Sequence, residues 1–334
     1  MIEQKCGELS AFIAKQKEIN YLYYINKSAR RIPLHTKLND EIIKTVAYFD
    51  IFEYPLTAEQ IHTFLPRSAD SPSVVIECAD RLVSEGALSK ADGYYFLPSV
   101  KENYVAQRLS GELRAKKLIS VARTVSSFIK LVPFTRAVFI TGSLSKNIAD
   151  DSSDIDFMIV TARDRLWICK TILTVFRKLF LFGNSKYFCT NYYVTENGYS
   201  QHHRNLYTAI EVVTTKVLWN EPAFKQFQAE NKWTSEFLPN ACIHPQQNLL
   251  ISHSRSWLQK GLENGMRLLP LGWLNRKLME IHKEHWEGIF QSAGRENQNA
   301  LFIITPDISS CWPNDRQKPI LSQFLQKLSF LGLQ

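Results

Sequence analysis

The chain reads Arg136-Ala-Val-Phe-Ile-Thr-Gly142-Ser143 and, after ten intervening residues, Asp154-Ile-Asp156-Phe-Met-Ile-Val-Thr161. This pattern predicts a strand that ends in a Gly-Ser turn, a short spacer, and a second strand that two acids open. Because alternate side chains of a strand share a face, Asp154 and Asp156 should point the same way while Ile155 enters the core. The sequence therefore predicts two carboxylates side by side at one end of a rigid strand.

The two carboxylates indicate a site for a divalent cation. Neighbouring carboxylates repel each other unless a cation lies between them, and Mg²⁺ (or Mn²⁺) prefers oxygen ligands. The preceding turn suits a phosphate, because Gly142 lets the backbone approach closely and successive N–H groups with the Ser143 hydroxyl can surround its oxygens. Lys146 in the spacer is a further candidate contact for a triphosphate, or a solvated charge.

The order of strand, Gly-Ser turn, spacer and Asp-x-Asp strand resembles the DNA polymerase beta-like nucleotidyltransferase superfamily. The resemblance covers about residues 115–196 and is carried by Gly142, Ser143, Asp154 and Asp156. It implies that Gly142 and Ser143 hold the β- and γ-phosphates of an NTP, with ATP the expected one. It also implies that Asp154 and Asp156 are catalytic residues that hold metal ions, while a nucleoside monophosphate moves to a hydroxyl and pyrophosphate leaves.

The superfamily pattern includes a third acid on the strand that follows the helix predicted at 164–181, and this chain departs from it. Asn191 stands at the expected position. Its amide oxygen can ligate Mg²⁺, but it lacks the charge to bind a second metal tightly or to accept a proton. Glu196 is an alternative third ligand or base if the chain bends back after the strand. Glu211 is another, unless it lies at the edge of its helix beside Lys216.

Residues 39–98 show the pattern of three helices and a short hairpin. The segments 41–49, 58–64 and 72–84 favour helices, and residues 87–97 favour two short strands. This layout resembles the winged-helix family, which usually indicates DNA binding. The segment carries four basic and ten acidic side chains, a net charge of −6, which would repel phosphates. We therefore expect a packing or protein-contact role, with DNA binding less favoured.

The expected fold class is α/β (α+β): a mixed-sheet nucleotidyltransferase core with a winged-helix-like N-terminal module and a helical C-terminal lobe. The predicted parts are a helical segment (1–38), the winged-helix-like domain (39–100), the core (101–200), the helical lobe (201–290), and a loop with a terminal helix (291–334). A basic amphipathic helix over 101–131 should open the core. The residues expected on or near its apolar face are Val105, Leu109, Leu113, Leu118, Val121, Val125 and Phe128. His282 and His285 have the spacing of metal ligands, but we expect both to be solvent-exposed.

Composition favours a protein of the cytoplasm. The 334 residues are 45% hydrophobic and 22% charged, with a net charge of +8, which excludes wholesale disorder and suits polyanionic ligands. The six cysteines form no Cys-x-x-Cys pair, which fits a reducing compartment. The N-terminus lacks the apolar core of a signal peptide, and charges interrupt the most apolar stretch, 166–182. We expect a cytoplasmic location and no membrane partner.

Three functional hypotheses follow from these patterns. The first is a Mg²⁺-dependent nucleotidyltransferase whose acceptor is a hydroxyl of a small molecule, a protein or an RNA. The second is a nucleotide-binding sensor module, catalytically impaired because Asn191 replaces the third carboxylate. The third and least favoured is a regulator that binds DNA through the winged helix.

Overall fold

The structure, a computed structural model, describes residues 37–68, 71–98, 103–180, 186–241, 249–251, 254–292, 301–312 and 316–333. The chain divides into two compact units. Unit 1 comprises Met1–Leu109, Leu238–Ala241 and Ile320–Gln334, and unit 2 comprises Ser110–Phe237 and Cys242–Pro319. Apart from its last two residues, the helical segment predicted at 1–38 lies outside the described residues. Within the described part of the chain, no helix is both long enough and apolar enough to cross a membrane.

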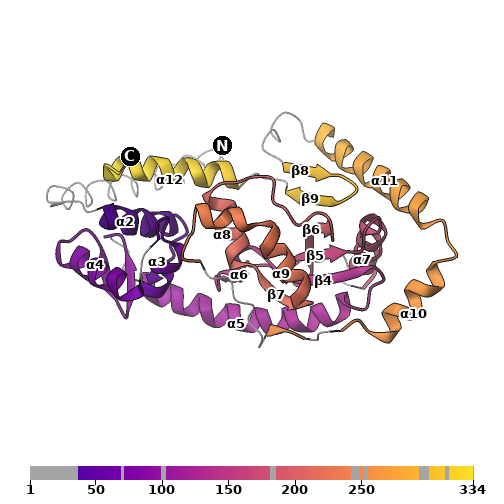
Figure 1. The fold of residues 1–334 in the computed structure, drawn as a ribbon, viewed down its shortest axis with the longest axis horizontal. Coiled ribbons are helices and arrows are strands. Elements are labelled where there is room, and N and C mark those ends of the chain that lie inside the picture. The colour runs from indigo at the N-terminus through magenta and orange to yellow at the C-terminus, as the bar shows by residue number, and fades with distance from the viewer. Residues whose placement is uncertain are drawn as a thin grey trace, which may run out of the picture. The chain divides into compact units, whose positions relative to one another are not determined.

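The described part of unit 1 begins with three helices and a small antiparallel sheet. The helices are α2 (Lys37–Asp50), α3 (Ala58–Phe64) and α4 (Pro72–Ser84), and the strands are β1 (Leu56–Thr57), β2 (Ser89–Ala91) and β3 (Tyr94–Phe96) (Figure 1). Thr57 starts α3 with a capping box, in which its hydroxyl accepts from the Gln60 N–H while the Gln60 side chain accepts from the Thr57 N–H. The helices and the hairpin lie where the sequence predicts them.

The last helix, α12 (Gln317–Leu331), completes unit 1 from the far end of the chain. Lys327 forms an ion pair with the buried carboxylate of Asp50, which lies 277 positions earlier in the sequence. The Asp50 carboxylate also accepts a hydrogen bond from the Tyr104 hydroxyl at 2.9 Å. The Phe324 ring packs edge-on against Tyr48, with 5.3 Å between centroids. Unit 1 is therefore assembled from segments at both ends of the chain.

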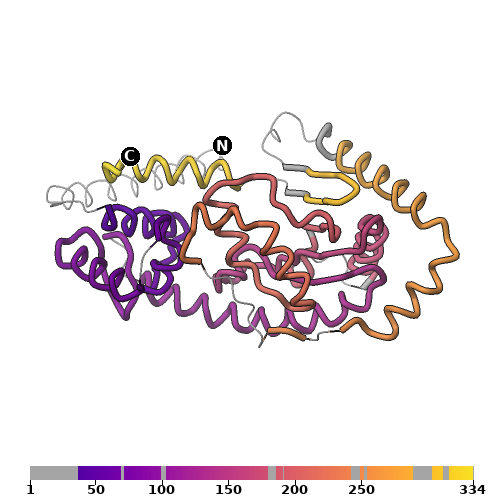
Figure 2. The backbone as a smooth tube through the Cα atoms, viewed as in Figure 1, coloured from indigo at the N-terminus to yellow at the C-terminus, as the bar shows by residue number. Residues whose placement is uncertain are grey.

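Unit 2 is built on a six-stranded mixed sheet in the order β7-β4-β5-β6-β9-β8 (Figures 1 and 2). The strands are β4 (Thr135–Ile140), β5 (Asp156–Thr161), β6 (Cys189–Thr195), β7 (Lys216–Trp219), β8 (Leu301–Ile304) and β9 (Ile308–Trp312). β5 and β6 run parallel and are joined by α7 (Leu166–Phe180), whereas all other neighbouring pairs are antiparallel. The helical crossover therefore brings the start of β6 beside the start of β5.

Helices cover both faces of this sheet. Val138 and Ile159 point to the face that packs against α5 (Tyr104–Ile129), α7 and α11 (Leu271–Ser292). Phe139 and Met158 point to the opposite face, which packs against α8 (Leu206–Thr214) and α9 (Glu221–Glu230). The remaining helical elements of the unit are α6 (Gly142–Ser145), η2 (Lys232–Glu236) and α10 (Trp257–Met266). Because Asp156 alternates with Phe157, its side chain lies on the α8 side.

Three strands of unit 2 lie where the sequence predicts helix or loop. β7 lies in the segment predicted to be a helical lobe (201–290), and β8 and β9 lie in the segment expected to be a loop. The residues of β7 are all buried, because they pair with β4 at the edge of the core. Runs of Val, Ile, Leu and Trp suit a strand or a buried helix equally well, and here tertiary pairing decides between them.

The packing face predicted for the helix of the core is confirmed in part, because Val105 is buried and Leu118 and Val125 pack against the core, whereas Val121 is exposed. α5 packs in unit 2 through Ala115, Ala122 and Ile129, which are spaced at seven residues and fully buried. Leu113 and Phe128, expected on the apolar face, are exposed, as is Leu109. Small alanine side chains allow close approach of the helix to its neighbours, and a sequence pattern weighted by leucines misses such a face.

His282 on α11 is half-buried rather than exposed, whereas His285 is exposed as expected. Its Nε2 lies 3.1 Å from the Thr171 hydroxyl on α7, and its ring packs near Trp167 at 5.4 Å between centroids. Burial, and then the charge of Lys170, lower the pKa of His282 to about 4. The imidazole is therefore neutral near pH 7 and belongs to the α7–α11 contact.

Candidate metal and phosphate site

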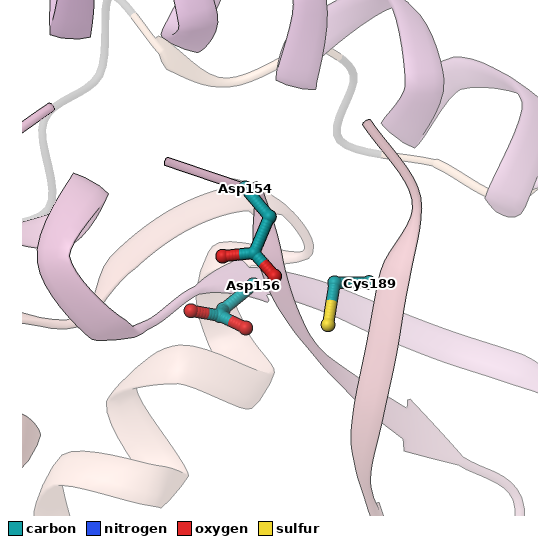
Figure 3. Close-up of side chains that lie close together, drawn as sticks. All are labelled: Asp154, Asp156 and Cys189. Atoms are coloured by element: carbon teal, nitrogen blue, oxygen red, sulfur yellow. The ribbon is translucent and has the colours of Figure 1, made fainter. Parts of the chain in front are cut away.

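Asp154 and Asp156 lie at the entry to β5, as the sequence predicts, and their carboxylates lie close together (Figure 3). Ile155 between them is fully buried on the opposite face. Its backbone is held against the start of β6, because its N–H donates to the Lys186 carbonyl at 2.9 Å and its carbonyl accepts from the Cys189 N–H at 3.2 Å. These bonds fix the two carboxylates at the same edge of the sheet.

Cys189 is the third side chain of this cluster, and the sequence analysis did not single it out. It is the first residue of β6 and pairs directly with Asp156 across the parallel ladder. One ligand atom each from Asp154, Asp156 and Cys189 lie within 4.8 Å of one another (Figure 3), the only such group of His, Cys, Asp or Glu in the described part of the chain. Burial, and then the charges of both carboxylates, raise the pKa of the Cys189 thiol. The thiol is therefore protonated near neutral pH.

Asp156 is the more perturbed of the two acids. Burial raises its pKa from 3.8 to about 6, and the negative charges of Asp154 and Glu211 act in the same direction. A hydrogen bond with Cys189 and the positive charge of Arg316 act against this rise. An ionised carboxylate is therefore costly at this position, and a bound cation would remove that cost.

Gly142 brings the turn after β4 against the carboxylates. The Thr141 N–H donates to the Asp156 carbonyl at 3.0 Å, and Gly142 follows with a positive φ of 69°. A Cβ atom built on Gly142 would lie 2.4 Å from Oδ2 of Asp156, closer than real Cβ contacts occur. Both the backbone conformation and the close approach favour glycine at this position.

Lys146 and Glu211 form an ion pair at the same turn. The Lys146 ammonium donates to Oε1 of Glu211 at 2.7 Å and to the Gly142 carbonyl at 3.0 Å. Lys216, which the sequence analysis considered as a neighbour of Glu211, instead donates to the Ser145 carbonyl and to Oδ1 of Asn147. Burial, and then the charge of Lys146, lower the pKa of Lys216 to about 8. Helix α8 thus supplies a carboxylate that holds Lys146 beside Gly142.

The other predicted site residues, Ser143, Asn191 and Glu196, lie at different distances from the carboxylates of Asp154 and Asp156. Ser143 follows Gly142 as the second residue of α6, and within the described residues its hydroxyl has no hydrogen-bond partner. Asn191 lies in β6 two residues beyond Cys189, and an irregularity of register falls between the pairs that flank it. The N–H of Glu196 donates to the carbonyl of Thr161, the last residue of β5. Glu196 therefore lies at the opposite end of β5, about 16 Å from the entry at ~3.3 Å per residue.

Arg316 is a second residue that the sequence analysis missed. It directly precedes α12, is exposed, and its charge favours the ionised form of Asp156. No local pattern marks it, because 160 positions separate it from Asp156 along the chain. It adds a cation to the edge at which the carboxylates lie.

The donor atoms of the cluster fit one hard divalent cation. Asp154 and Asp156 offer carboxylate oxygens, which Mg²⁺ and Mn²⁺ prefer, and waters and substrate phosphates usually complete such a shell. A thiol is a soft ligand that suits Zn²⁺ better, and the raised pKa of Cys189 opposes the thiolate form. The residues therefore fit an ion held by the two carboxylates, with Cys189 as a hydrogen-bond donor to them.

Comparisons of the chain with protein-family models, curated proteins and solved structures gave no match.

Proposed function

We propose that unit 2 is the core of a Mg²⁺-dependent nucleotidyltransferase, which moves a nucleoside monophosphate from an NTP, with ATP the expected donor, to an acceptor hydroxyl. The observation that carries this proposal is the approach of Gly142 to Asp156, where a Cβ atom would lie 2.4 Å from Oδ2. A turn suited to phosphate and a carboxylate suited to a cation are thus immediate neighbours. A triphosphate at the turn would complete the shell of an ion held at the carboxylates.

Each residue of the site has a distinct role in this proposal. Asp154 and Asp156 would hold the ion, which would stabilise the negative charge on the nucleotidyl group during its transfer. The backbone N–H groups after Gly142 and the Ser143 hydroxyl bind the phosphates. Lys146 adds a positive charge to the phosphates from a position that Glu211 fixes, since their ion pair places the ammonium 3.0 Å from the Gly142 carbonyl.

A nucleotide-binding sensor without turnover is the second candidate, and the position of Cys189 favours it. The residue paired with Asp156 on the next strand carries a protonated thiol rather than a third carboxylate. A thiol with a raised pKa cannot hold a second metal ion as a carboxylate does, and it is a poor base for an attacking hydroxyl. The sensor candidate keeps the metal and phosphate roles above and drops the chemical step.

The test is incubation of the full-length protein with Mg²⁺ or Mn²⁺ and each NTP labelled at the α-phosphate. Three acceptor pools are supplied in separate arms: small hydroxyl compounds, proteins, and RNA. Labelled product with stoichiometric pyrophosphate supports transfer, and the Asp154→Asn variant should abolish it. Metal-dependent NTP binding with no product in any arm supports the sensor. Absence of metal-dependent NTP binding contradicts both candidates.

Substitution of Cys189 separates the two candidates further. If the missing acid prevents chemistry, the Cys189→Asp variant should gain pyrophosphate release, because its carboxylate would stand beside Asp156. Asn191→Asp is the matched variant, since it places the same charge two residues along the strand. Unchanged binding without turnover in both variants would leave the sensor as the function of the site.

A further inference from the structure

Helix α10 packs on unit 2 with a polar face. Gln259 is fully buried, and its side-chain amide donates to the Thr135 carbonyl at 2.8 Å. Glu263 pairs with Arg136 at 2.8 Å and accepts a hydrogen bond from the Phe134 N–H at 2.7 Å. Most surface helices bury an apolar stripe, whereas α10 buries hydrogen-bonding groups one helical turn apart.

The opposite face of α10 is apolar and exposed. Trp257 is 83% exposed, Leu268 in the bend between α10 and α11 is 94% exposed, and Trp273 on α11 is 60% exposed. Figures 1 and 2 show α10 and α11 as consecutive helices that meet at this bend. We call this surface the α10–α11 patch; its members are Trp257, Leu258, Leu262, Leu268, Leu269 and Trp273. Exposed apolar surface of this kind marks an interaction site.

The segment that carries the α10–α11 patch contains more basic than acidic residues, although Lys277 pairs with Glu280 just beyond it. Residues 254–277 contain five basic side chains and one acidic side chain. The acid is Glu263, which is already paired with Arg136 and with Arg255. Lys260 and Arg267 are exposed beside the apolar side chains. The occupant of the patch must therefore accept apolar side chains and cations together.

We propose that the α10–α11 patch docks on the surface of an anionic phospholipid bilayer. Tryptophans suit the headgroup level, leucines suit the boundary with the acyl chains, and lysine and arginine suit anionic headgroups. A second copy of the chain fits poorly, because two patches of the same positive charge would face each other. A nucleic acid would neutralise the cations but leave Leu268 without an apolar partner.

This docking is peripheral, and it differs from the expectation of no membrane partner. α10 is 10 residues long, about 15 Å, so it can lie along a bilayer surface but cannot cross one. The proposal is independent of nucleotidyl transfer, because it uses none of the residues at the carboxylate site.

Co-sedimentation of the full-length protein with lipid vesicles tests this inference. Vesicles of phosphatidylcholine alone are compared with vesicles that also contain phosphatidylglycerol. We expect binding to the anionic vesicles, weakened by salt, and about tenfold weaker binding for Leu268→Glu because a charge replaces an inserted leucine. Lys260→Glu should also weaken binding. The matched control is Leu113→Glu on α5, whose leucine is 61% exposed outside the patch and whose replacement should leave binding unchanged.

Thermal unfolding of each variant checks that all three keep the native fold. Absence of binding to anionic vesicles, or equal loss of binding in the control variant, would overturn the proposal. Concentration-dependent self-association that Leu268→Glu abolishes would assign the patch to a second copy instead. Retention of RNA that depends on Lys260 but not on Leu268 would assign it to a nucleic acid.

Discussion

Replacement of Asp156 by asparagine should stabilise the metal-free protein at neutral pH. The folded state raises the pKa of this carboxyl from 3.8 to about 6, chiefly through burial. A raised carboxyl pKa means that the folded protein holds the proton more tightly than the unfolded chain does. Stability therefore falls as the pH rises from about 4 to about 6, and by pH 7 the cost of the ionised carboxylate is about 3 kcal/mol. Asparagine avoids this cost because it does not ionise.

The assay is urea unfolding of wild type and Asp156→Asn in the presence of EDTA, between pH 4 and pH 8. The free energy of unfolding of the variant should exceed that of the wild type by up to about 3 kcal/mol at pH 7, and the difference should vanish near pH 4. Addition of Mg²⁺ or Mn²⁺ should stabilise the wild type and leave the variant unchanged. A variant that is less stable than the wild type at pH 7 in EDTA, or a difference that does not depend on pH, would refute this reasoning.

Asp150→Asn is a matched control with the opposite sign. The Asp150 carboxylate accepts hydrogen bonds from the Ser152 and Ser153 hydroxyls, and these bonds lower its pKa. A lowered pKa stabilises the fold above the ordinary value of 3.8, so the asparagine variant should be the less stable protein at pH 7. The two variants together separate the effect of burial from a general effect of removing charge.

Two further variants test the turn and the α7–α11 contact. Gly142→Ala should weaken Mn²⁺ binding, measured by calorimetry, and lower stability, because the new Cβ atom would meet Oδ2 of Asp156. Gly86→Ala is the control: Gly86 also has a positive φ, but a Cβ atom there would have no atom within 4 Å. It should therefore cost only the backbone strain, about 1–2 kcal/mol. Because the pKa of His282 is lowered in the folded state, the wild type should lose up to about 3 kcal/mol of stability as the pH falls from 6.5 to 4. His282→Gln should not show this loss. An acid-unfolding profile that His282→Gln leaves unchanged would contradict the lowered pKa of His282. A Mn²⁺ affinity that Gly142→Ala leaves unchanged would contradict the role of the turn in the metal site.

The local part of the site could be predicted from the sequence. β4, the Gly-Ser turn and β5 are adjacent in the chain, so alternation and turn chemistry alone place Asp154 and Asp156 on one face and Ile155 on the other. The same holds for the helices and hairpin of residues 39–98, each of which has its own start and stop signals. Fold class follows from these short-range patterns.

The contacts of the site between residues far apart in the sequence could not be predicted. Cys189 meets Asp156 because of the register of two parallel strands separated by a whole helix, and a register irregularity beyond that pair makes counting along the strand unsafe. The ion pair of Lys146 with Glu211 joins residues 65 positions apart. The amphipathic pattern of α10 would place Gln259 on the solvent-exposed face, whereas the structure buries it.

The discontinuity of unit 1 has consequences for biosynthesis. The contact between Lys327 and Asp50 can form only after α12 has left the ribosome, long after Asp50 itself. Apart from the first three residues of α12, unit 2 precedes that helix in the chain and can fold earlier during synthesis. A chain truncated before α12 would therefore contain the carboxylate site but leave the N-terminal unit unfinished, and such truncations should mature poorly in the cell.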